Sequence, residues 1–134
     1  MRILLDTHVL LWSMTDDARI PEHIRTMIGN AGNDIFFSLA SVWEVAIKHT
    51  SKPEVMPISE EFFMNCCLQS GFTLLPIEAK HIIAIKSLHR ENNAPSHKDP
   101  FDKLLISQAK TESMTFITHD KLLPYYNESC IFSF

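Results

Sequence analysis

Short apolar runs that alternate with helical patterns predict a fold in which strands and helices follow each other along the chain. Four runs lack the polar alternation of a half-exposed strand, which is typical of strands covered on both faces of a parallel sheet. They span residues 3–5, 34–38, 72–76 and 114–118, and a short final strand is expected at 131–134. Helices are expected between them over 8–14, from Pro21 onward, over 42–49, from Ser59 onward, over 78–88 and from Pro100 onward. This order predicts one α/β domain over residues 1–134, with a parallel sheet sandwiched between helices.

Several of these elements carry further signals. Ser41 is the expected N-cap of the helix over 42–49, and Asp99 followed by Pro100 is a typical helix start. Residues 89–97 are almost entirely polar and form the clearest mobile loop in the sequence. In the helix over 78–88, the residues expected to face the core are Ile82, Ile83 and Ile85.

Composition narrows the class of protein. With 46% hydrophobic residues, 21% charged residues and 3 glycines, the 134 residues are typical of one globular domain without low-complexity segments. The three cysteines match neither a disulfide framework nor a zinc motif, which favours a cytoplasmic protein with reduced thiols. Neither an export signal nor an apolar run of the ~20 residues that a membrane span needs is found. The net charge of −4 argues against coating nucleic acid by bulk charge, but not against an enzyme whose carboxylates bind metal ions.

Two carboxylates follow predicted strands. Asp6 stands where the first strand leaves the sheet, and Asp120 follows the fourth strand after Thr118 and His119. In open α/β sheets, ligand sites form beyond the carboxyl ends of the strands. Asp6 is therefore either a working residue or simply the N-cap of the next helix.

Two more carboxylates lie near helix starts. Glu44 is embedded in a helix that is apolar on nearly all sides, so it needs a cation, a hydrogen-bond network or a metal unless its head reaches the helix edge. Asp102 shares one face with Leu105 and Ile106 and therefore points at the rim of the core. Asp99 is better explained as a helix cap, with a supporting role at the same site as the alternative.

Strand exits and helix starts lie on one edge of a parallel α/β sheet. Four carboxylates from distant parts of the chain are therefore expected to converge there: Asp6, Glu44, Asp102 and Asp120. Such a cluster repels itself unless protons or cations intervene, and oxygen ligands suit Mg²⁺ or Mn²⁺. The pattern thus favours metal-assisted hydrolysis of phosphodiester bonds.

In order and spacing, these motifs resemble the PIN-domain ribonucleases of the VapC toxin kind over nearly the whole chain. The motifs are Leu4-Leu5-Asp6-Thr7-His8 with Leu10-Leu11-Trp12, Ser38 through Ser41-Val42-Trp43-Glu44, Asp99-Pro100-Phe101-Asp102 with Leu104-Leu105-Ile106 and Gln108-Ala109, and Phe116-Ile117-Thr118-His119-Asp120. The resemblance implies a doubly wound α/β sandwich. It also implies an endoribonuclease that is the toxin of a type II toxin–antitoxin pair and uses Mg²⁺, with Mn²⁺ as a substitute.

The resemblance also assigns residues and partners. Its acidic positions fall on Asp6, Glu44, Asp102 and Asp120, with Asp99 as a possible further ligand and Ser38 and Thr118 as hydrogen-bonding neighbours. It implies a cognate antitoxin, and operator DNA that is bound only through the antitoxin complex. A homodimer formed through helices is usual for the family, and exposed Trp12, Phe62 or Phe63 are candidates for its interface.

Basic residues flank the expected cleft and either hold RNA backbone or are simply solvated: Arg90, Lys98, Lys103 and Lys121. His8 and His119 stand beside two of the acids, where they orient water or RNA, or are ordinary polar residues at strand exits. A haloacid-dehalogenase-like phosphatase is disfavoured because it needs a second Asp where His8 stands. The rival from another class is a non-catalytic binding module of the same fold, acting through its antitoxin and DNA.

Overall fold

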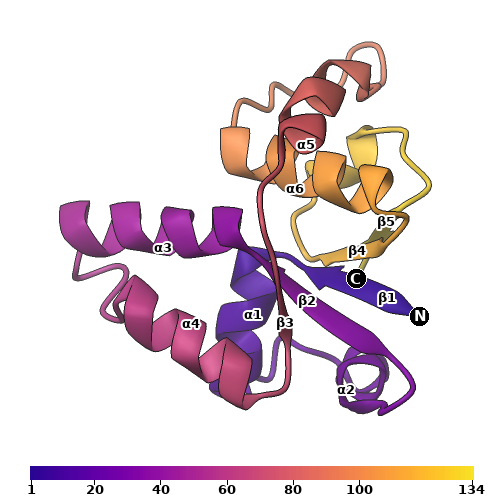
Figure 1. Cartoon of the computed structure of the whole chain (residues 1–134). Coiled ribbons are helices and arrows are strands. Elements are labelled where there is room, and N and C mark those ends of the chain that lie inside the picture. The colour runs from indigo at the N-terminus through magenta and orange to yellow at the C-terminus, as the bar shows by residue number, and fades with distance from the viewer.

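Five parallel strands form one sheet in the order β3-β2-β1-β4-β5 in the computed structural model, which describes residues 1–134 (Figure 1). The central strand is β1 (Arg2–Leu5), between β2 (Asp34–Ser38) and β4 (Thr115–Thr118). The edge strands are β3 (Thr73–Leu75) and β5 (Ile131–Ser133). In register, Ile3 pairs with Ile35 on one side and with Thr115 on the other. The predicted α/β fold with a parallel sheet is confirmed.

Helices cover both faces of this sheet. They are α1 (Thr7–Met14), α2 (Glu22–Gly29), α3 (Leu39–Ser51), α4 (Glu60–Gln69), α5 (Ala79–Ile83) and α6 (Pro100–Thr111), with 3-10 turns at Ala84–Ser87 and Leu123–Tyr125. Because side chains alternate along a strand, Ile3 and Leu5 enter a core with α1, α2 and α4, whereas Leu4 enters a second core with α6. Figure 1 shows α5 and α6 on the opposite side of the sheet from α1, α2 and α4. None of the helices combines the length and the apolar surface that crossing a membrane needs.

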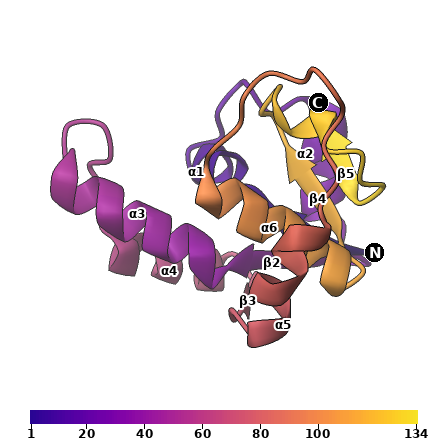
Figure 2. The same ribbon diagram turned by 90° about the horizontal axis from the view of Figure 1, so that it is seen from above.

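The start and the surface of α3 differ from the prediction. The helix begins at Leu39, and its N-cap is Ser38, whose Oγ accepts a hydrogen bond from the Ala40 N–H at 3.0 Å. No loop separates β2 from α3, so the expected cap at Ser41 is wrong and Ser41 lies within the helix. Figure 2 shows α3 extending outward from the body of the molecule, which leaves Trp43 and Ile47 exposed. The helix is therefore not buried on all sides.

Two predictions about which side chains are buried and which are exposed also fail. In α5, Ile82 and Ile83 are exposed, and the buried residue is His81. The helix ends at Ile83 because the chain tightens into the 3-10 turn that follows. In α4, Phe63 is completely buried and cannot form a dimer surface, whereas its neighbour Phe62 is exposed.

Candidate functional site

All four predicted carboxylates lie at the carboxyl edge of the sheet. Asp6 directly follows β1, and Asp120 follows β4, the strand beside it. Glu44 lies in the second turn of α3, and Asp102 lies in the first turn of α6. Each comes from a different element, and the charges of the other three act on Asp102. The fold thus brings together the residues that the sequence analysis placed together.

Asp6 is at once a helix cap and a member of this cluster. Its Oδ1 accepts a hydrogen bond from the Thr7 N–H at 2.7 Å, which caps α1, and its Oδ2 accepts one from Thr118 Oγ1 at 2.6 Å. The same threonine oxygen accepts the Asp120 N–H at 3.1 Å, so Thr118 links the two strand exits. Burial raises the pKa of Asp6 to about 6, against the opposing effect of these hydrogen bonds.

Glu44 is buried, and its carboxylate is paired with a lysine and a threonine hydroxyl. Its Oε2 lies 2.6 Å from Lys48 Nζ, one helical turn further on, and its Oε1 lies 2.8 Å from Thr7 Oγ1. Thr7 Oγ1 also lies 2.8 Å from Ser41 Oγ. Because a carboxylate can only accept hydrogen bonds, the Thr7 hydroxyl donates its hydrogen bond to Glu44 and accepts one from the Ser41 hydroxyl. The roles of Thr7 and Lys48 were not predicted from the sequence, although Lys48 lies four residues after Glu44, a spacing at which helical side chains pair.

Asp102 is the most strongly perturbed group of the site. Burial, and then the negative charges of Asp6 and Asp99, raise its pKa to about 8. Asp99 caps α6 as predicted, because its Oδ1 accepts the N–H groups of Phe101 at 2.9 Å and of Asp102 at 3.3 Å. His97, which the sequence analysis left without a role, places its Nε2 3.1 Å from Asp102 Oδ2.

The predicted supporting and flanking residues divide into two groups. Ser38 does not bond to a carboxylate: it caps α3 and lies 2.5 Å from Gln108 Oε1 on α6. Arg90 is engaged within the fold, since it donates to the carbonyls of Leu122 and Pro95. His119 bonds to the Phe134 carbonyl and stacks on its ring. By contrast, the basic and histidine side chains that remain open to solvent are Lys98 and Lys121, partly Lys103, and His8.

A small cavity opens beside the cluster. It has a volume of about 190 Å³ and is lined by Asp6, His8, Trp12, His119 and Asp120. The indole of Trp12 lies edge-on to the His119 ring, with 5.5 Å between centroids. The cavity thus gives two of the carboxylates access to solvent at the strand exits.

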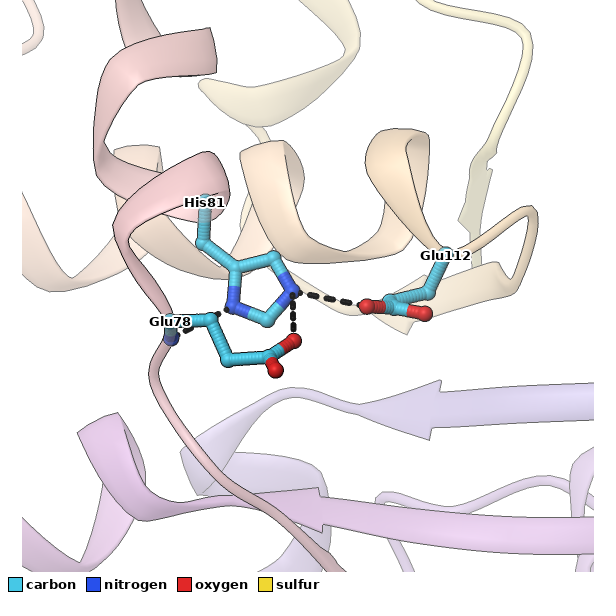
Figure 3. A group of neighbouring side chains, drawn as sticks. All are labelled: Glu78, His81 and Glu112. Carbon is cyan, nitrogen blue, oxygen red and sulfur yellow. Dashed lines mark hydrogen bonds and ion pairs between the residues drawn. The ribbon is translucent and has the colours of Figure 1, made fainter.

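A second group of potential metal ligands lies away from this edge, where α5 meets the end of α6 (Figure 3). His81 Nε2 lies 2.9 Å from Glu112 Oε1, and His81 Nδ1 accepts the Glu78 N–H at 3.0 Å. The proton of the neutral ring is therefore on Nε2. A metal could bind Nε2 only if that nitrogen carried no proton. Lys80 Nζ, 2.9 Å from Glu112 Oε1, already supplies a cation. This group is an ion-pair cluster that ties α5 to α6.

The four-carboxylate cluster, by contrast, fits a hard divalent cation. Its donors are carboxylate oxygens from four elements, and the raised pKa values of Asp6 and Asp102 show that their negative charges are not fully compensated by the protein. Oxygen ligands of this kind suit Mg²⁺ and Mn²⁺ rather than zinc. Within the cluster, the potential ligand atoms that lie within 4.8 Å of one another belong to His97, Asp102 and Asp120, a group that does not include Asp6 or Glu44. The nitrogen of Lys48 is also close, but it is paired with Glu44.

Comparison with known proteins gives two matches of different weight. The sequence profile of the PIN domain matches residues 3–128. Seventeen chains of solved structures match the fold, among them one in the crystal structure of VapBC2 from Rickettsia felis bound to a DNA fragment from their promoter. That alignment covers 100% of this chain and 98% of the other, with a TM-score of 0.67 and 16% identity, and it supports the fold alone. No curated protein matches the sequence.

Proposed function

The chain belongs to the PIN domain family, and from that premise we propose that it is a metal-dependent endoribonuclease, the toxin of a type II toxin–antitoxin pair. PIN domains are generally nucleases. The observation that carries the proposal is the meeting of four carboxylates at one sheet edge, with the pKa of Asp102 raised to about 8. A cluster that holds protons in this way is a site that a divalent cation stabilises.

Each carboxylate has a role in the proposal. Asp6, Glu44 and Asp102 hold one Mg²⁺, for which Mn²⁺ can substitute, while Asp120 completes the site or assists a second ion. Such an ion lowers the pKa of a bound water and stabilises charge on the phosphate. Thr118 supports this set by holding Asp6 and the backbone of Asp120 in fixed geometry. Asp99, as the cap of α6, keeps Asp102 at the cluster.

RNA binding is assigned to the exposed charges beside the carboxylates. Lys98 and Lys121 are open to solvent, and Lys103 is partly so, which suits contact with phosphate oxygens. Arg90, by contrast, is not expected to contact RNA, because its guanidinium donates to carbonyls of the protein itself. His8 lines the cavity beside Asp6 and is placed to orient RNA or water.

The proposal includes partners and a compartment. The family resemblance supports a cognate antitoxin that blocks the site, and the matching fold in a VapBC2 complex with promoter DNA is consistent with this. Operator DNA would then be bound only through the antitoxin complex, and the toxin would form a homodimer. In this proposal, one nuclease domain spans residues 1–134 and acts in the cytoplasm.

Cleavage by purified variants tests the proposal. Asp6→Ala and Asp102→Ala should each nearly abolish RNA cleavage, and a chelator should do the same to the wild type. Asp34→Ala is the matched control, because Asp34 is exposed at the opposite edge of the sheet. Circular dichroism must show that each variant is folded. If the two site variants cut RNA at the wild-type rate, the enzyme proposal is wrong, and the non-catalytic binding module becomes the better explanation.

Affinity for RNA gives a second, independent measurement. In the Asp6→Ala variant, RNA affinity should survive or rise, because an anion near the phosphates is removed. Lys98→Ala or Lys103→Ala should instead weaken binding and reduce its dependence on salt, since each lost phosphate contact removes part of the counterion-release effect. Lys86→Ala, an exposed lysine on the 3-10 turn after α5, is the control that should bind as the wild type does.

A further inference from the structure

The carboxylate of Asp102 has only one side-chain hydrogen-bond partner, and that partner comes from the polar loop over residues 89–97. Asp6 is held by Thr118 of β4, and Glu44 is held by Thr7 and Lys48. The corresponding donor for Asp102 is His97, with its Nε2 3.1 Å from Oδ2. The loop therefore supplies a group that none of the regular elements provides.

His97 is fixed in place rather than free on the surface. Its side chain is only 3% exposed. Its Nδ1 lies 2.8 Å from the hydroxyl of Tyr126, a buried residue, and the two rings meet edge-to-face with 5.4 Å between centroids. Both ring nitrogens thus have partners, one on each side of the imidazole.

Arg90 anchors the other side of this arrangement. Its guanidinium carbon lies 4.8 Å from the centre of the Tyr126 ring, and the backbones of Arg90 and Tyr126 form an antiparallel bridge. The Arg90 side chain also donates to the Leu122 carbonyl at 3.2 Å, which ties the loop to the turn after β4, and to the Pro95 carbonyl, which ties the start of the loop to its later part. A continuous path of contacts therefore runs from Arg90 through Tyr126 and His97 to Asp102.

The direction of the hydrogen bonds follows from the chemistry of the groups. Asp102 must be ionised to bind a cation, and an ionised carboxylate only accepts hydrogen bonds. The proton of a neutral His97 is then on Nε2, facing Asp102, and Nδ1 accepts a hydrogen bond from the Tyr126 hydroxyl. One oxygen of Asp102 is occupied by His97, and the other is left for the cation.

On this basis we propose that His97 is a positioning residue, which fixes the orientation of Asp102 for the divalent cation through a hydrogen bond and is itself held by Tyr126. The inference rests on the proposed metal-dependent function. Hydrogen-bond partners that orient a metal ligand typically change metal affinity by about 10- to 100-fold when they are removed. The loop that carries His97 would thereby set the metal affinity of the site.

Calorimetric titration of the RNA-free protein with Mn²⁺ tests the inference. His97→Ala should weaken Mn²⁺ binding by about tenfold or more. His97→Gln should restore most of the affinity, because the glutamine amide can also donate to Asp102. Tyr126→Phe, which removes only the hydroxyl, should give a loss smaller than that of His97→Ala. His89→Gln is the matched control, an exposed histidine of the same loop, and should bind Mn²⁺ as the wild type does.

A second comparison shows that the effect passes through Asp102. In an Asp102→Asn background, His97→Ala should cause no further loss of Mn²⁺ affinity, because the charge that His97 orients is gone. Melting temperatures in a chelator separate this role from a structural one. If His97→Ala lowers the melting temperature but leaves Mn²⁺ affinity unchanged, the inference is overturned.

Two other results would refute different parts of the reasoning: one the positioning role of His97, the other the proposed metal-dependent function. If His97→Gln binds as poorly as His97→Ala, while both still fold, the imidazole is itself a ligand and the positioning role is wrong. If the wild type binds no Mn²⁺ at all, the proposed function fails first and the inference falls with it. Should His97→Ala not fold, His97→Gln and Tyr126→Phe still decide the question, since only a positioning role predicts near-normal affinity in the first and a loss in the second.

Discussion

Replacing Asp102 by Asn should change how the stability of the metal-free protein depends on pH. The pKa of Asp102 is raised to about 8 by burial first and then by the surrounding carboxylates, whereas an unfolded Asp titrates at about 3.9. Between these values the folded protein binds more protons than the unfolded chain. The free energy of unfolding therefore falls as the pH rises through this window, and levels off above the folded pKa.

The size of the effect is clearest between pH 6.5 and pH 8. The pKa of Asp6 is about 6, so Asp6 is largely ionised throughout this range. His97, whose pKa is lowered by burial, acts in the opposite direction and only below the unfolded value of about 6.5. One carboxylate contributes at most about 1.4 kcal/mol per pH unit, or about 2 kcal/mol over this interval. For a chain of this length, that corresponds to roughly 5–10 °C in melting temperature.

Thermal unfolding followed by circular dichroism, in a chelator and at constant ionic strength, measures this difference. The wild-type melting temperature should fall between pH 6.5 and pH 8, and that of Asp102→Asn should stay nearly constant. The comparison removes the contribution of other histidines, which titrate in both proteins. Saturating Mn²⁺ should flatten the wild-type curve by binding the native state. Parallel curves for the two proteins without metal would show that the pKa of Asp102 is not raised in the folded protein, and the reasoning would be refuted.

Three further substitutions separate support of the site from support of the fold. Thr118→Val should weaken Mn²⁺ binding about tenfold in calorimetry by releasing Asp6, as expected for a partner that orients a ligand. Ser38→Ala should lower the free energy of unfolding by about 1–2 kcal/mol in urea titrations, because α3 loses its cap. Phe63→Ala should cost about 3–5 kcal/mol in the same assay, yet leave Mn²⁺ affinity unchanged, because its ring belongs to the core that α1, α2 and α4 form with the sheet.

The parts of the site that a sequence can predict are those set by local rules. Asp6 and Asp120 follow strands, so the position of strand exits in a parallel sheet is enough to bring them to one edge. Asp99 followed by Pro100 is a typical helix start by residue type alone, and the cap is found as predicted. These features depend on a few neighbouring residues, so they can be predicted without knowing how the rest of the chain packs.

The features of the site that the sequence does not reveal depend on partners far along the chain. His97 has a role only because Tyr126, 29 residues later, fixes its ring beside Asp102. His81 is buried, and Ile82 exposed, because Glu112 at the C-cap of α6 pairs with the imidazole, which hydropathy alone does not show. At the start of α3, Ser38 and Ser41 are equally good caps by type, and only the pairing of Ser38 with β3 shows where the strand ends.

The order of the strands has a consequence for biosynthesis. β1 is made before β2 and β3, yet its partner β4 is made after both of them, and the hydrogen bond from Thr118 to Asp6 joins residues 112 positions apart. Contacts of such long range form late and slowly in folding. In a nascent chain whose β4 has not yet left the ribosome, Thr118 and Asp120 are not available, so Asp6 lacks its hydrogen-bond donor and the carboxylate beside it. If the proposed nuclease site needs all four carboxylates, this topology leaves the site incomplete until β4 has been made, while the chain is still beside the RNA from which it is being read.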